Sequence, residues 1–144
     1  MRSNSFLNRF YKYSKDYTTS FVIIPLVVYW IGLFILTTIP ADKVPQLFEN
    51  QDKYEHFIAY AGLAFLLSLA LYFQKKSILI SSKAFLFTIV FILIYGAVDE
   101  VHQLFIPGRW CDFYDWLADS FGGLIGVTIA YLFIRKESQK FSNI

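Results

Sequence analysis

The chain is poor in cysteine and in charge, and both scarcities limit what it can be. Cys111 is its only cysteine, so a disulfide within the chain is excluded. Charged residues make up 17% of its 144 residues, and the net charge at pH 7 is +2. The basic residues occur in short scattered groups, which argues against a nucleic-acid partner. The chain is therefore neither a disulfide-stabilised scaffold nor, by its charge, a nucleic-acid-binding protein.

Apolar sequence is abundant: 56% of the residues are hydrophobic, and the mean hydropathy is +0.47. The apolar residues form long blocks without helical or strand spacing, as expected of lipid-facing helices. A helix of about 20 residues crosses a hydrocarbon core roughly 30 Å thick. Four blocks reach or approach that length: residues 21–39, 56–73, 84–98 with a continuation to 105, and 116–134. The sequence therefore predicts an all-α fold, a polytopic transmembrane four-helix bundle.

Basic residues are distributed unevenly between the two sides of such a bundle. Lys43, Lys53 and Arg109 fall on one side. The other ten fall on the side of the two termini: Arg2, Arg9, Lys12, Lys15, Lys75, Lys76, Lys83, Arg135, Lys136 and Lys140. Because loops rich in lysine and arginine stay in the cytoplasm, both termini are predicted to be cytoplasmic. The predicted organisation is a cytoplasmic tail at 1–18, a transmembrane domain at 19–134 and a second cytoplasmic tail at 135–144.

Ionisable residues near the opposite side of the bundle form three segments, at 52–56, 99–103 and 109–119. Counted from the far ends of their helices, Asp99 and Asp119 lie roughly 22 Å along the span and His56 roughly 26 Å. All three would therefore lie inside a hydrocarbon core about 30 Å thick. The sequence predicts that three helices bring ionisable groups to a similar depth.

Helical geometry indicates which of these side chains face the interior of the bundle. At about 100° per residue, Asp99, His102 and Gln103 lie within roughly 100° of one another on the third span. Glu100 is predicted to point away from their centre. Charges inside the hydrocarbon are costly unless they face other helices, so we expect the polar faces to converge.

The fourth span carries carboxylates and small residues on one face. Its carboxylates lie within roughly 60° of one another: Asp112, Asp115 and Asp119. The same face continues into small residues at every fourth position: Ala118, Gly122 and Gly126. Small residues let helices approach closely, so we predict a packing role for the glycines. On the second span, Asp52 and His56 form an i, i+4 pair if that helix begins early.

Several kinds of chemistry fit this cluster. No cofactor is identified by the sequence, but a divalent metal ion could be held by five candidates: His56, Asp99, His102, Asp112 and Asp115. The cluster could also act as a general acid–base pair, or as a path for protons or ions. It could instead be a buried ion-pair network that only sets the helix register. The sequence leaves open whether the chain is an enzyme.

Arg109 has two interpretations. It follows Pro107 and Gly108, a turn signal that ends the third span. In an external loop, its guanidinium could hold a lipid phosphate or a carboxylate with two hydrogen bonds. Alternatively, it pairs with Asp112 or Asp115 and has only a structural role.

The polar residues also carry a family resemblance. It rests on two strings, Asp52-Lys53-x-x-His56-Phe57 and Asp99-Glu100-x-x-Gln103-x-Phe105-x-Pro107-Gly108-Arg109-x-x-Asp112-x-x-Asp115. Over residues 24–134 the chain resembles the VanZ-like family, whose pattern has asparagine where this sequence has Asp119. The resemblance implies a small multi-pass protein of the bacterial plasma membrane. The family's namesake gives low-level resistance to teicoplanin, a lipidated glycopeptide antibiotic.

The leading hypothesis is a cell-envelope protein whose extracytoplasmic polar pocket binds an amphiphile or lipid-linked headgroup, and in one version modifies it. Hypothetical catalytic roles fall to Asp99, His102, Asp112 and Asp115. Binding roles fall to Asp52, Lys53, His56, Glu100, Gln103, Arg109 and Asp119. The alternative is a non-enzymatic structural or accessory membrane protein whose charge cluster only holds the helices together. Transport is a weaker third hypothesis, because four helices are few for a carrier and no span is broken by glycine or proline.

Overall fold

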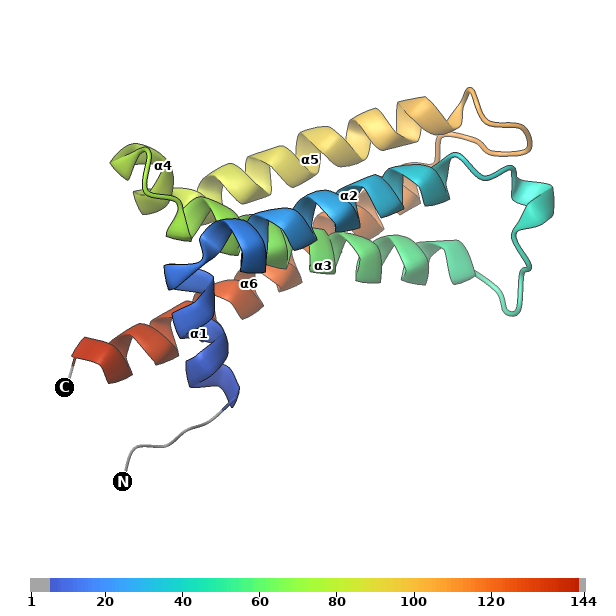
Figure 1. Cartoon of the computed structure of the whole chain (residues 1–144). Coiled ribbons are helices and arrows are strands. Elements are labelled where there is room, and N and C mark those ends of the chain that lie inside the picture. The colour runs from blue at the N-terminus through green and yellow to red at the C-terminus, as the bar shows by residue number, and fades with distance from the viewer. Residues whose placement is uncertain (1–5, 143–144) are drawn as a thin grey trace.

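The structure is a computed structural model that describes residues 6–142, and it consists of helices joined by loops (Figure 1). No strand occurs within that range. Four helices are long and apolar enough to cross a membrane: Thr19–Thr37, Gln51–Phe73, Ala84–Gln103 and Phe113–Lys140. The predicted all-α bundle with four spans is confirmed. Arg2, one of the cations used to predict the topology, lies outside the described residues.

The helical elements follow one another in the order α1 (Phe6–Asp16), η1 (Thr19–Ile23), α2 (Ile24–Thr37), η2 (Ala41–Lys43), α3 (Gln51–Phe73), α4 (Ile78–Ser82), α5 (Ala84–Gln103) and α6 (Phe113–Ser142). The π-helical η1 runs directly into α2, so the two form the first span. Pro25, which has no backbone N–H to donate, lies just after the junction of η1 with α2.

Some helix boundaries differ from the predicted ones because polar turns extend the helices beyond their apolar blocks. α3 begins at Gln51 rather than near residue 56, directly after Asn50, whose φ of 58° is left-handed. This early start places Asp52 and His56 one turn apart on the same helix. Helical structure also continues into the segments predicted as tails, as α1 within residues 1–18 and as the last turns of α6 beyond residue 134.

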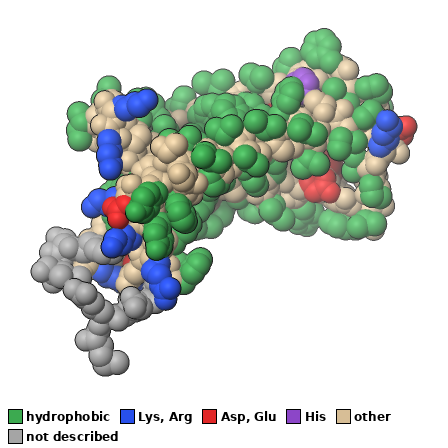
Figure 2. All heavy atoms as spheres, viewed as in Figure 1, with side chains coloured by type: hydrophobic (Ala, Val, Ile, Leu, Met, Phe, Trp, Pro, Cys, Tyr) green, Lys and Arg blue, Asp and Glu red, His purple; other side chains and the backbone are tan. Residues whose placement is uncertain are grey.

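The two ends of the bundle differ in composition. Chain direction makes α3 and α6 parallel, while α2 and α5 run the opposite way (Figure 1). α1, α4 and the last turns of α6 lie together at one end, where lysine and arginine side chains gather (Figure 2). We call this the basic end. The other is the polar end, made of loops 38–50 and 104–112 and the adjoining helix ends. Which side of a membrane each end faces stays a prediction.

Two glycines of α6 allow it to lie against the backbone of α3. A Cβ added at Gly122 would overlap the carbonyl oxygen of Phe57, and one added at Gly126 would overlap that of Ala61. The contacts advance by four residues on both helices, which is about one helical turn. The predicted packing role of the small residues is confirmed for these two glycines, and we call the contact the glycine seam.

Alanine at Gly122 tests the glycine seam. We expect Gly122→Ala to lower the free energy of unfolding by about 1–3 kcal/mol, because the added methyl group must push two backbones apart. Gly32→Ala is the matched control, since a Cβ at Gly32 on α2 meets nothing within 4 Å. The measurement is thermal or denaturant unfolding of purified protein in detergent. Equal effects of the two substitutions would contradict this packing.

Candidate functional site

Lys53 is the centre of the first polar group, which joins the beginnings of α3 and α6. Its Nζ lies 2.9 Å from Asp112 Oδ2, 3.0 Å from Asp115 Oδ1 and 3.1 Å from Asp52 Oδ2. The Asp115 side chain is 8% exposed and that of Lys53 28% exposed, so the ammonium is held at the edge of the protein interior. We call these four residues the lysine centre. They form an ion network between two parallel helices.

Asp112 also begins α6. Its Oδ1 accepts a hydrogen bond from the Tyr114 backbone N–H at 2.8 Å, which satisfies one of the free donors of the first turn. The hydrogen bonds from Lys53 and from Tyr114 hold the pKa of the Asp112 carboxyl below its ordinary value. Asp112 therefore stays ionised while it joins the helix terminus to the lysine centre.

The second polar group is buried between α3, α5 and α6. His56 Nδ1 lies 2.9 Å from Asp119 Oδ1, and its Nε2 lies 3.4 Å from the Gln103 side-chain amide nitrogen. Glu100 Oε2 accepts a hydrogen bond of 2.7 Å from the Asp112 backbone N–H. His56, Glu100, Gln103 and Asp119 are at most 8% exposed. We call these four residues the histidine centre.

Asp99 has a partner that was not predicted. The hydroxyl of Tyr60 donates a hydrogen bond of 3.3 Å to Asp99 Oδ2, and both side chains are buried. Tyr60 lies one turn after His56 on α3, and their rings stack at 6.4 Å. The four-residue spacing from His56 was the available signal, but a tyrosine within an apolar block does not stand out from ordinary core aromatics.

The predicted orientation of α5 is wrong for two of its residues. Glu100 was expected to point away from the polar face, yet it is 2% exposed and bonded to α6. His102, predicted to lie with Asp99 and Gln103, stacks instead on Phe34 of α2, with the ring centroids 5.1 Å apart. Around the axis of α5, Asp99 and Gln103 lie within an arc of roughly 100° whether His102 or Glu100 is the third member. Because α6 packs on the side of Glu100, Glu100 is the one that joins them.

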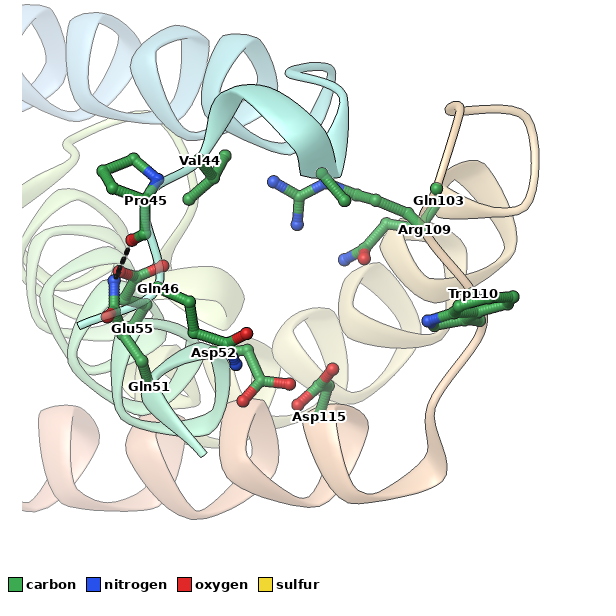
Figure 3. A pocket seen from close by; sticks show the side chains of 12 residues that line it. Val44, Pro45, Gln46, Gln51, Asp52, Glu55, Gln103, Arg109, Trp110 and Asp115 are labelled. Carbon is green, nitrogen blue, oxygen red and sulfur yellow. Dashed lines mark hydrogen bonds between the residues drawn. The ribbon is translucent and has the colours of Figure 1, made fainter. Parts of the chain in front are cut away.

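Arg109 does not pair with Asp112 or Asp115. The turn before it is closed by Gly108, whose φ of 75° is left-handed, and its Nε donates a 2.9 Å hydrogen bond to the carbonyl of Ile39. Within the described part of the chain, the ion pairs of those two acids are made by Lys53. Arg109 therefore faces the loop after α2, across a pocket from Asp115 (Figure 3).

Two cavities that share some of their lining residues open at the polar end. The first, the polar pocket of Figure 3, has a volume of about 270 Å³ and is lined by residues including Asp52, Glu55, Gln103, Arg109 and Asp115. The second, the apolar groove, has a volume of about 610 Å³ and runs between α2, α3 and α5. Its walls include Tyr29, Leu33, Ile58, Ala59 and Tyr95, and Lys43 and Arg109 line the part nearest the loops. Arg109 borders both cavities.

The predicted set of five metal ligands does not come together. Among the described residues, donor atoms lie within 4.8 Å of one another in two groups of three: His56, Glu100 and Asp119, and Asp52, Asp112 and Asp115. Asp99 and His102 belong to neither group. The predicted ligands His56, Asp112 and Asp115 are therefore divided between two centres, one of which already contains Lys53.

Comparison with known protein families identifies the family of the chain. A family described as VanZ/LLP1 matches residues 8–134, which is most of the chain. The chain belongs to the VanZ/LLP1 family. No curated protein and no solved structure matches it. The predicted family is thus confirmed, and apart from Asp119 the lysine and histidine centres are built from the residues that carried the resemblance.

Replacing Lys53 tests the lysine centre. We expect Lys53→Met to lower the free energy of unfolding by about 2 kcal/mol, because three carboxylates lose their shared charged partner. Lys75→Met, in an exposed loop at the basic end, is the control and should have little effect. Unfolding of the purified variants gives the comparison. In an Asp115→Asn background the effect of Lys53→Met should shrink, and strict additivity would contradict a direct interaction.

Proposed function

We propose that this VanZ/LLP1-family protein binds an anionic amphiphile, with an acyl chain in the apolar groove and the anionic headgroup at Arg109. The observation that carries the proposal is the position of Arg109, which borders the apolar groove and the polar pocket at once. Its Nε is fixed by the Ile39 carbonyl, so the rest of the guanidinium is held in place. A planar guanidinium binds phosphate or carboxylate oxygens with two parallel hydrogen bonds.

The lining of the groove supports an acyl chain as the buried part of the ligand. Leu33 and Ile58 lie on its walls, and Ile58 is 66% exposed, so the groove adjoins the surface where lipid chains would lie. A binding site for a small molecule is typically 300–1,000 Å³ and mainly apolar with a few polar groups. The groove, at about 610 Å³ with Arg109 and Lys43 near the loops, fits that description.

Reacting groups for a modification of the headgroup adjoin this site. His56 and Asp99 line the groove. An imidazole next to carboxylates can donate or accept a proton. These contacts favour His56 over His102 as the histidine next to a bound ligand, since His102 borders neither cavity.

A structural role is favoured for the lysine centre. The Lys53 ammonium has three carboxylate partners, which matches its three N–H donors. A side chain satisfied in this way has no free donor for a ligand. We therefore assign the lysine centre to holding α3 against α6, and the cavities and the histidine centre to ligand binding.

The cellular setting follows from charge and family. We propose that the polar end faces the outside of a bacterial plasma membrane, because the basic end carries nine of the described lysines and arginines. Teicoplanin carries an acyl chain, so it belongs to the chemical class that the groove would accept. A link to glycopeptide resistance is part of this proposal, and either the antibiotic or an envelope lipid could be the physiological ligand.

Photolabelling tests the amphiphile site. The probe is phosphatidylglycerol with a diazirine in one acyl chain, presented to the protein in nanodiscs. Arg109→Gln should weaken the labelling of groove residues about tenfold, equivalent to about 1.4 kcal/mol from a lost charged contact. Leu33→Trp should also reduce it by filling the groove. Peptide mapping by mass spectrometry identifies the labelled residues.

The control for photolabelling is Lys75→Gln, which removes a cation from the basic end and should leave groove labelling unchanged. A zwitterionic phosphatidylcholine probe with the same chain should label the groove less than phosphatidylglycerol. Labelling that is equal in wild type, Arg109→Gln and Leu33→Trp would contradict the proposed function.

Cys111 allows a test of membrane orientation without an introduced label site. It is the only cysteine, and it is exposed in the loop before α6. We expect a membrane-impermeant maleimide to label Cys111 in intact cells, and Cys111→Ser to abolish the signal. In that background, Ser82→Cys at the basic end should be labelled only after the membrane is permeabilised. The reverse pattern would contradict the proposed orientation.

A further inference from the structure

The histidine centre contains two buried carboxylate oxygens without hydrogen-bond partners. Glu100 and Asp119 are 2% and 0% exposed. Each uses one oxygen, Glu100 for the Asp112 backbone N–H and Asp119 for the His56 ring. Glu100 Oε1 and Asp119 Oδ2 receive no hydrogen bond from any described residue. Buried polar atoms in native proteins nearly always have partners, so each of these oxygens calls for one.

Negative charge is also in excess around these oxygens. The buried carboxylates of the polar end are Asp99, Glu100, Asp115 and Asp119. Apart from His56, Lys53 is the one basic side chain of the described residues that forms an ion pair with acids at this end, and it is shared among three carboxylates. Charge buried without compensation is costly. A bound cation would offset this excess.

We propose that His56, Glu100 and Asp119 bind a divalent metal ion, Zn²⁺ or Mn²⁺. Their donor atoms lie within 4.8 Å of one another, and the three residues come from α3, α5 and α6. Imidazole suits zinc and other transition metals, while carboxylates suit harder ions including Mn²⁺. The mixed set disfavours Ca²⁺, which takes oxygen ligands only. Three protein ligands leave room for a further ligand, as in catalytic zinc sites.

The other group of three acids at the polar end also requires a compensating positive charge. Asp52, Asp112 and Asp115 surround the Lys53 ammonium at 2.9–3.1 Å. A cation of the chain itself therefore compensates these carboxylates. Among the described residues, no lysine or arginine forms an ion pair with Glu100 or Asp119. A metal ion takes there the role that Lys53 has in the lysine centre.

Asp119 supplies one of the anionic ligands of this site. A neutral amide is a poorer ligand for a divalent cation than a carboxylate. Asp119→Asn therefore keeps the shape of the side chain while it removes an anionic ligand. The site does not depend on the proposed amphiphile, because all three ligands and both free oxygens belong to the protein.

Metal binding to the purified full-length chain tests the proposal. The protein is stripped with EDTA in detergent and then titrated with Zn²⁺ or Mn²⁺ alone. We expect one ion per chain by calorimetry and elemental analysis, with binding weakened at least tenfold in Asp119→Asn and in Glu100→Gln. Asp42→Asn and Glu49→Gln remove exposed loop carboxylates and should leave binding unchanged.

A second measurement uses the wild-type chain and does not depend on the folding of a variant. Pulsed electron paramagnetic resonance of bound Mn²⁺ should show coupling to a nitrogen nucleus, which the His56 imidazole would supply. Absence of stoichiometric binding, binding that survives both Asp119→Asn and Glu100→Gln, or a bound Mn²⁺ without nitrogen coupling would overturn the proposal. None of these results would bear on lipid photolabelling at Arg109, so the two proposals fail separately.

Discussion

The close contact of α3 with α6 is the constraint on which the polar end depends. At Gly122 and Gly126 the two helix backbones approach more closely than a Cβ would permit. Because the helices run parallel and the contacts repeat every turn, the same register continues toward the polar end. His56, which directly precedes Phe57 on α3, meets Asp119, about one turn before Gly122 on α6. About one turn further along both helices, Lys53 meets Asp115. Van der Waals packing in the apolar half thus sets the partners of the charges.

This register divides the ionisable residues into two centres, which differ in whether their carboxylate oxygens all have hydrogen-bond partners. Around Lys53, donors and carboxylate acceptors match, and the resulting ion network fastens two helix ends. Around His56, two buried carboxylate oxygens have no described partner. A saturated network has little left to offer a ligand, whereas the free oxygens of an unsaturated one can accept a cation. Stabilisation and ligand binding are therefore assigned to neighbouring but separate groups of residues.

The sequence predicted the spans and most members of the polar end, because charges are conspicuous within apolar blocks. It did not predict how they pair. Arg109 was considered as a partner of the α6 acids, but the left-handed turn at Gly108 directs it to a carbonyl after α2, and Lys53 takes those acids. Glu100 and His102 occupy equivalent arcs on one helix, so only the position of α6 decides between them. The apolar groove was not predicted, because its lining residues come from different helices and no single segment of the sequence indicates it.

The distance between the Lys53 ammonium and the carboxyl groups of α6 tests the register of α3 against α6 most directly. It can be measured in lipid bilayers by solid-state NMR, as the dipolar coupling between Lys53 ¹⁵Nζ and the ¹³C carboxyl carbons of Asp112 and Asp115. The Nζ–oxygen contacts of 2.9 and 3.0 Å predict a strong coupling to both carbons. Absence of coupling to either carboxyl carbon in folded protein would show that the glycine seam does not align the two helices as described.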